Sequence, residues 1–242
     1  MYKRQALDVA DTLSVQETLA YWDLLELASR RILLDFSGVD KLAVKSGVQC
    51  LPIRASSERK YFEYALSVGI KLKKEEYADF VRAITPLIVD LFEMILKKQC
   101  GVDVNDYCDV SGHNLIRRWS RKKLAGTQVG KILEKEYKDR FQYKDVYSVH
   151  LKLLIENIST DMELIQLINN VRNVEEGVRN LAAHQIISVT DETIRQRTGF
   201  TATQIMDMIK RLFSYTGISV KKEYWDSYDQ MNKLIIERMS IK

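Results

Sequence analysis

Residues 146–184 read VYSVHLKLLIENISTDMELIQLINNVRNVEEGVRNLAAH, and this stretch decides the fold class. Its apolar residues recur at intervals of three and four, the spacing that places side chains on one face of an α-helix. They are Val149, Leu151, Leu153, Leu154, Ile155, Leu164, Leu167, Ile168, Val171, Val174 and Val178. The stretch therefore predicts long helix, in which Gly177 is a weak interior point.

Outward from this stretch the same spacing recurs along most of the chain. With 10 Gly and 2 Pro in 242 residues the chain has few turn formers, whereas sheet-rich folds need many. Thr201 and Gln204 have the spacing of a capping box, and Gly101 and Gly217 are suited to close helices. The sequence thus predicts an all-α chain, with Pro86 kinking or breaking one helix. Beyond the opening stretch, the expected helices are 4–36 (divided near Ser14), 57–72, 74–99, 201–215 and roughly 222–239.

Two segments are expected to lack long helices. Residues 37–57 contain two Gly, a Pro and several Ser, so they predict a long connection. Residues 102–145 are the most polar and basic part, and they predict an inserted region of loop with short helices near 115–124 and 129–141. We expect one helical domain over 1–242. Its motif-bearing helices would occupy 146–242, with a short strand or a helix exit at 186–190.

The composition of the chain allows predictions about its compartment and its class of partner. There are 37 Lys and Arg against 33 Asp and Glu, a net charge of +4 that permits a polyanionic partner. Three separated cysteines predict buried free thiols in a reducing compartment. No apolar run approaches the ~20 residues that span a bilayer, and no signal peptide is evident. We expect a cytoplasmic protein without a membrane segment, and the immediate helical start indicates a piece of a longer chain.

Several kinds of chemistry lack their motif in this sequence. It has no phosphate-binding loop, no dinucleotide fingerprint and no nucleophile elbow. Its three histidines are far apart, and no group of residues has metal-ligand spacing. We therefore expect neither a cofactor nor a metal.

The segment that remains is Arg179-Asn-Leu-Ala-Ala-His184. Asn180 precedes His184 by four residues, so in a helix its amide shares a face with the imidazole and can orient it. Arg179 lies about 140° from His184 around an ideal helix. A regular helix would aim the two side chains apart, so either the helix ends or distorts there, or residues from elsewhere complete the site.

These residue types suit RNA cleavage, because RNA carries its own nucleophile in the 2′-hydroxyl. Histidine can move protons near neutral pH, and arginine can clamp phosphate oxygens. On spacing alone a second interpretation stays open, in which His184 is a hydrogen-bonded residue at a helix end and Arg179 is merely solvated. One turn earlier, Glu175 and Glu176 are placed to pair with Arg179.

RNLAAH, late in a long helix of an all-α chain, resembles the R-x(4–6)-H signature of HEPN ribonucleases. The chain looks most like the HEPN portion of the accessory ribonucleases of type III CRISPR systems. The motif covers six residues, and the helical arrangement extends the resemblance loosely to most of the chain. It implies a HEPN-like helical bundle in which Arg179 and His184 are catalytic and Asn180 supports them.

The resemblance also implies a reaction and a partner. The family cleaves single-stranded RNA without metal, leaves 2′,3′-cyclic phosphate ends, and forms homodimers that place two motifs in one cleft across a two-fold axis. Those CRISPR enzymes carry an α/β sensor domain for cyclic oligoadenylate, and this sequence shows no strand–helix alternation that would build one. A stand-alone HEPN toxin of a toxin–antitoxin pair and a non-catalytic helical RNA-binding module remain alternatives.

A second candidate region is the basic stretch 117–123. It has five positive charges, one aromatic residue and no acid, so its cations could follow an RNA backbone while the indole stacks on a base. In the competing interpretation it is a solvated helix start with Trp119 turned into the core. We expect His113 and His150 to be structural. The RNA-binding candidates are Arg117, Arg118, Trp119, Arg121, Lys122 and Lys123.

Overall fold

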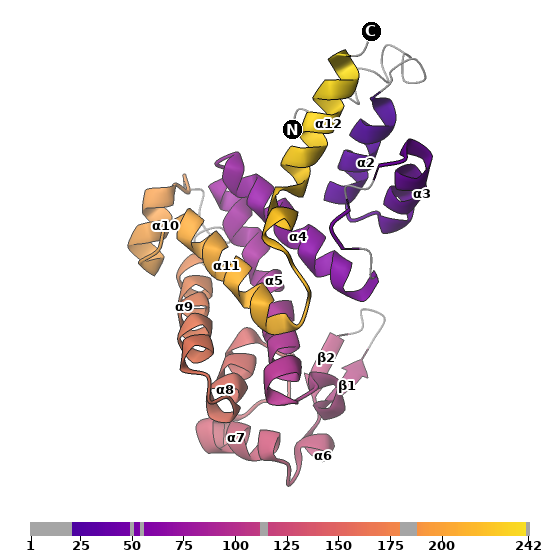
Figure 1. Ribbon diagram of the computed structural model, residues 1–242. Coiled ribbons are helices and arrows are strands. Elements are labelled where there is room, and N and C mark those ends of the chain that lie inside the picture. The colour runs from indigo at the N-terminus through magenta and orange to yellow at the C-terminus, as the bar shows by residue number, and fades with distance from the viewer. Residues whose placement is uncertain (1–20, 49–50, 54–55, 112–115, 180–187, 241–242) are drawn as a thin grey trace. The chain divides into compact units, whose positions relative to one another are not determined.

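The computed structural model describes residues 21–48, 51–53, 56–111, 116–179 and 188–240 (Figure 1). These residues fall into two compact units. Unit 1 takes residues up to Ser67 together with those from Val220 onward, and unit 2 takes Val68–Ser219. The helix α4 (Ser56–Lys73) continues across the boundary in sequence. The described elements of each unit are almost all helical, which confirms the all-α prediction.

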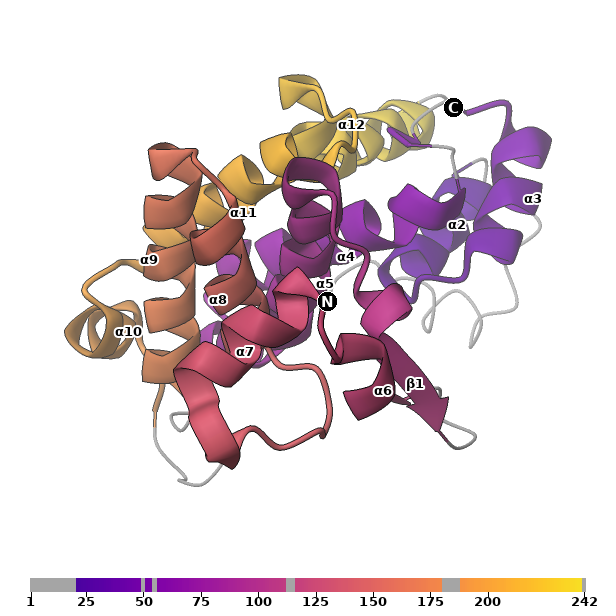
Figure 2. The same cartoon turned by 90° about the horizontal axis from the view of Figure 1, so that it is seen from below.

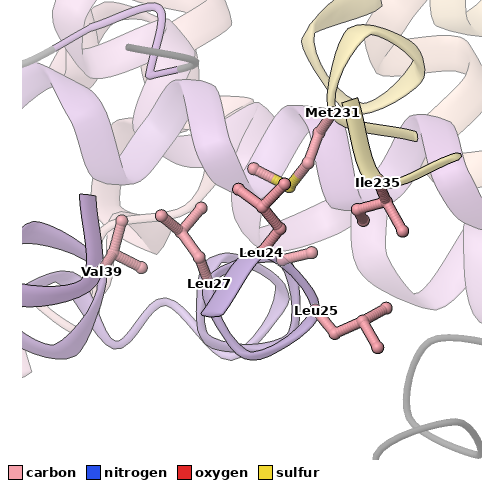
Figure 3. Packing of buried hydrophobic residues seen from close by; sticks show 7 residues of the cluster. Leu24, Leu25, Leu27, Val39, Met231 and Ile235 are labelled. Carbon is pink, nitrogen blue, oxygen red and sulfur yellow. The ribbon is translucent and has the colours of Figure 1, made fainter. Parts of the chain in front are cut away.

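Unit 1 is held together by an apolar cluster from three helices. Leu24 and Leu27 of α2 are fully buried, and Val39 of α3 and Met231 of α12 pack in the same cluster (Figure 3). The unit also contains a buried ion pair. Arg31 and Glu63 form two hydrogen bonds of 3.0 Å. The helices and the 3-10 turn that complete this unit are α2 (Trp22–Ile32), α3 (Phe36–Ser46), η4 (Lys222–Asp226) and α12 (Ser227–Ser240).

The helix α3 corrects one expectation, because residues 37–57 were predicted to be a long connection. Asp35 caps this helix by accepting a hydrogen bond from the Gly38 amide at 3.0 Å. A Cβ at Gly38 would overlap the side chains of Asp35 and Arg30, so this glycine permits close packing instead of breaking the helix. Gly47, with φ of 65°, ends the helix as a left-handed cap.

Unit 2 is built on the long helix α5, which packs against α8, α9 and α11 (Figure 1). The helix continues through Pro86, so this residue marks no break. Gly101 closes the helix with φ of 68°, as expected. The capping box of Thr201 and Gln204 is formed by both of its hydrogen bonds. The helices of this unit that follow α4 are α5 (Tyr77–Cys100), α6 (Arg121–Leu124), α7 (Gln128–Tyr137), α8 (Ser148–Ile158), α9 (Met162–Arg179), α10 (Asp191–Thr198) and α11 (Ala202–Thr216), with 3-10 turns η2 (Val104–Tyr107) and η3 (Lys138–Arg140).

The basic region between α5 and α8 differs from its prediction, because a hairpin replaces part of the expected short helix. Strands β1 (Cys108–Ser111) and β2 (Ile116–Trp119) pair antiparallel, with Cys108 opposite Trp119. Only Arg121–Leu124 is helical in the stretch where helix was expected from 115 to 124. Figure 2 shows β1 beside α6, with α7 following.

Candidate functional site

The helix α9 carries Arg179, the first residue of the candidate motif. Its apolar stripe is buried, which fixes the rotation of the helix against α5, α8 and α11. Arg179 is the last residue of this helix that the structure describes. The end or distortion that the sequence predicts near the motif falls outside the described residues. Asn180, His184 and the Arg179 side chain lie outside the described residues.

A buried polar network supports the last turn before Arg179. Glu175 is fully buried and accepts a hydrogen bond from the hydroxyl of Ser148, the first residue of α8. Arg172 reaches Glu175 at 3.3 Å and the exposed Glu176 at 2.8 Å. Both acids expected to pair with Arg179 are thus partners of Arg172. Because a carboxylate is costly to bury unless it is paired, this network commits α8 and α9 to one register.

The helix α10 packs against α9 at Gly177, two residues before Arg179. A Cβ at Gly177 would lie 2.9 Å from the Arg197 carbonyl oxygen and 3.0 Å from Thr198 Cγ2. Such distances leave no room for a side chain, so the two helices are in direct backbone contact. Thr190 caps α10, and Asp191 accepts a hydrogen bond from the Ala202 amide at 2.6 Å. The candidate segment is therefore anchored on both sides by packed helices.

The basic stretch 117–123 divides between the interior and the surface. Trp119 is 2% exposed, and its Nε1 donates to His150 Nδ1 at 3.0 Å. Arg117 forms two hydrogen bonds of 2.6 and 2.7 Å with Glu93. The proposal that Trp119 stacks on a base is therefore wrong for this structure, and the competing interpretation holds for that residue. Arg118 and Arg121–Lys123 are exposed.

Glu93 and Arg117 form a partly buried pair behind the hairpin. Burial raises the pKa of the Glu93 carboxyl group, and the hydrogen bonds from Arg117 oppose that shift. The Arg117 guanidinium is therefore already bound to the Glu93 carboxylate and has a structural role.

His150 is a structural residue, as expected. Four aromatic rings surround it, with centroids 5.6–5.9 Å away. Burial lowers the pKa of its imidazole to about 4. Because both Trp119 Nε1 and the Tyr147 amide donate to Nδ1, the proton of the neutral ring belongs on Nε2. This imidazole is unsuited to moving protons near neutral pH.

The described residues contain no group of three or more His, Cys, Asp or Glu residues placed to hold a metal ion. None of the described helices is long and apolar enough to cross a membrane.

Sequence spacing did not identify Ser148 or Arg172 as supports of the motif. Ser148 lies 27 residues before Glu175, so only the packing of α8 on α9 brings them together. Arg172 did carry a local signal, because it precedes two acids at the i,i+3 and i,i+4 spacings of a helix.

The class of protein is a HEPN domain. A family model described as the Cas_Csm6 HEPN domain matches residues 50–236, well over half of the chain. The chain belongs to this family. It is also similar to the CRISPR system endoribonuclease Csm6 of Mycobacterium tuberculosis (strain ATCC 25618 / H37Rv), with 25% identity over 183 residues. That alignment covers 75% of this chain and 40% of the relative, so the chain spans about two fifths of the relative's length.

Proposed function

We propose that this chain is the nuclease portion of a CRISPR-associated endoribonuclease that cleaves single-stranded RNA without a metal ion. The observation that carries the proposal is the Csm6 HEPN family match over residues 50–236, which includes the complete RNLAAH motif. Because the family match extends across both units, we propose that they belong to one HEPN-type domain.

In the proposed reaction the RNA 2′-hydroxyl attacks the neighbouring phosphorus. The 2′-O–P bond forms and the 5′-O–P bond breaks, which leaves a 2′,3′-cyclic phosphate and a 5′-hydroxyl. A base accepts the 2′-hydroxyl proton, and an acid returns a proton to the departing 5′-oxygen. His184 is the group that can move protons, Arg179 stabilises charge on the phosphate oxygens, and Asn180 orients the imidazole.

We propose that the active unit is a homodimer. In a regular helix Arg179 and His184 would point about 140° apart. A two-fold axis beside the motif supplies a second copy of each residue, so one cleft can combine groups from both protomers. This arrangement would require each chain only to present its motif toward its partner.

The decisive experiment incubates the purified chain with end-labelled single-stranded RNA in EDTA. We expect cleavage products with cyclic phosphate termini from the wild type, and none from Arg179→Ala or His184→Ala. His113→Ala is the matched histidine control and should cleave at the wild-type rate. Light scattering should give the mass of a dimer for all four proteins. Binding without cleavage by the wild type would refute the nuclease and support a non-catalytic RNA-binding module.

A further inference from the structure

The hairpin sorts the basic stretch into two faces. Successive side chains of a strand point to opposite sides, so Arg117 and Trp119 share one face and Arg118 takes the other. The first face is turned to Glu93 and His150 in the interior. Arg118 therefore belongs to an outward face.

Charges on the outward face are only partly balanced. Arg118 pairs with Asp145 at 3.1 Å, and Lys123 pairs with Asp109 at 3.3 Å. The next two cations, Arg121 and Lys122, are exposed, and among the described residues neither has a carboxylate within ion-pairing distance. The face thus has two cations available to a ligand, flanked by two more that are held in place by acids.

An aromatic ring lies beside these cations. The guanidinium carbon of Arg121 is 5.8 Å from the centroid of the Tyr143 ring. Tyr143 also packs edge-on against Phe141, at 5.0 Å between centroids, which fixes the plane of its half-buried ring. A ring held in one plane next to a cation can stack on a base while the cation binds the adjoining phosphate.

Residues 143–148 lead from this face to the first turn of α8, which bonds to the motif-bearing helix α9. Tyr147, four residues after Tyr143, is 45% exposed and directly precedes Ser148. Ser148 bonds to Glu175, one helical turn before Arg179. Because the five residues from Tyr143 to Ser148 span at most ~18 Å, the face lies within a few nucleotides' reach of the first turn of α8.

We propose that Arg118, Arg121, Lys122 and Tyr143 form a basic-aromatic track that binds single-stranded RNA beside the motif. RNA as the ligand class rests on the proposed function, whereas the track itself rests on the described side chains. Cations of the track bind phosphates, and the Tyr143 ring stacks on an unpaired base. Trp119 and Arg117 have no contact with the RNA, in contrast to the first of the two interpretations that the sequence left open.

The test measures binding without cleavage. The probe is a fluorescein-labelled 12-nucleotide RNA with 2′-O-methyl groups throughout, which removes the attacking hydroxyl. Fluorescence anisotropy with the full chain should show at least tenfold weaker binding for Arg121→Glu combined with Lys122→Glu. The slope of log affinity against log salt should flatten by roughly 1.4, since two phosphate contacts are lost.

Matched variants separate this effect from net charge and from misfolding. Lys131→Glu combined with Lys135→Glu, at two exposed sites on α7, makes the same charge change and should alter affinity less than threefold. Tyr143→Ala should weaken binding about tenfold while Tyr143→Phe retains it, because stacking uses the ring and not the hydroxyl. Equal affinities for the track and α7 double variants, or no measurable binding by the wild type, would overturn the proposal.

The track and the nuclease can fail separately. If the uncleavable RNA shows this dependence but ordinary RNA stays intact, the track stands and the nuclease proposal fails. If the wild type cleaves ordinary RNA and His184→Ala does not, while the track variants bind like the wild type, the nuclease stands and the track is refuted.

Discussion

Ser148, at the first turn of α8, donates a hydrogen bond to the buried Glu175, one turn before Arg179 on α9. The carboxylate is fully buried, so this contact offsets part of the cost of removing its charge from water. The first turn of α8 thereby fixes the turn of α9 that precedes Arg179, the proposed catalytic arginine.

Ser148→Ala should lower the free energy of unfolding by about 1.5–3 kcal/mol, the range for a hydrogen bond to a charged group. Urea unfolding measured at pH 7 gives this value. Ser148→Cys, of similar size, keeps a weak donor and should lose less than the alanine variant. Unchanged stability in both variants would contradict the role given to the hydroxyl.

Glu175 and Glu176 form a matched pair of neighbours, because Arg172 binds both while only Glu175 is buried. Glu175→Gln leaves the Arg172 charge in the interior with a weaker partner and should cost about 3 kcal/mol of stability. Glu176 is 60% exposed, so Glu176→Gln should cost less than about 1 kcal/mol. Denaturant unfolding of the two proteins compares them, and equal losses would show that burial does not decide the contribution.

Local patterns in the sequence predicted most helices correctly, because caps and apolar spacing act over one or two turns. Thr201 with Gln204, and Gly101 after α5, are examples of such local signals. The helix α3 was missed for a physical reason that is also local. Gly38 resembles a helix breaker in sequence, but it is required by the close approach of Arg30 and Asp35.

The site was less accessible to sequence reasoning than the fold, because its contacts join distant segments. Trp119 and His150 are 31 residues apart, and their hydrogen bond decides that the indole faces inward. No spacing rule reaches that far, so the indole seemed available to RNA. The catalytic roles of Arg179, Asn180 and His184 remain proposals, since those side chains lie outside the described residues.

The buried imidazole of His150 predicts a loss of stability in weak acid. Its pKa is about 4 in the fold against an ordinary value of 6.5, so between these pH values only the unfolded chain takes up the proton. Stability should be independent of this group above about pH 6.5, decline as pH falls toward 4, and lose nothing further below it. At pH 5 the loss relative to pH 7 is roughly 2 kcal/mol.

Urea unfolding of the wild type and of His150→Phe at pH 7 and pH 5 isolates this contribution from those of the carboxyl groups. The variant should be less stable at pH 7, where the Trp119 donor has lost its acceptor. Its further loss on going to pH 5 should be smaller than that of the wild type by about 2 kcal/mol. Parallel pH dependence in the two proteins would contradict a neutral buried imidazole.

Two helical glycines should respond in opposite directions to alanine. At Gly69 an added Cβ would lie 3.6 Å from Met206 Cε, an ordinary contact, so Gly69→Ala should stabilise the protein by about 0.5–1 kcal/mol. At Gly177 the added Cβ would lie 2.9 Å from the Arg197 carbonyl oxygen, which belongs to the backbone and cannot rotate away. Gly177→Ala should therefore push α10 away from α9. It should lower the free energy of unfolding by about 1–3 kcal/mol, although alanine has a better helix propensity than glycine.

Thermal unfolding of both variants checks these signs, and RNA cleavage adds a second readout. Because α9 and α10 anchor the two sides of the candidate segment, Gly177→Ala should lower the cleavage rate even at temperatures where the protein is fully folded. Gly69→Ala should leave that rate unchanged. A Gly177→Ala protein as stable and as active as the wild type would show that the contact between α9 and α10 can open without consequence, and the motif would then need no such anchor.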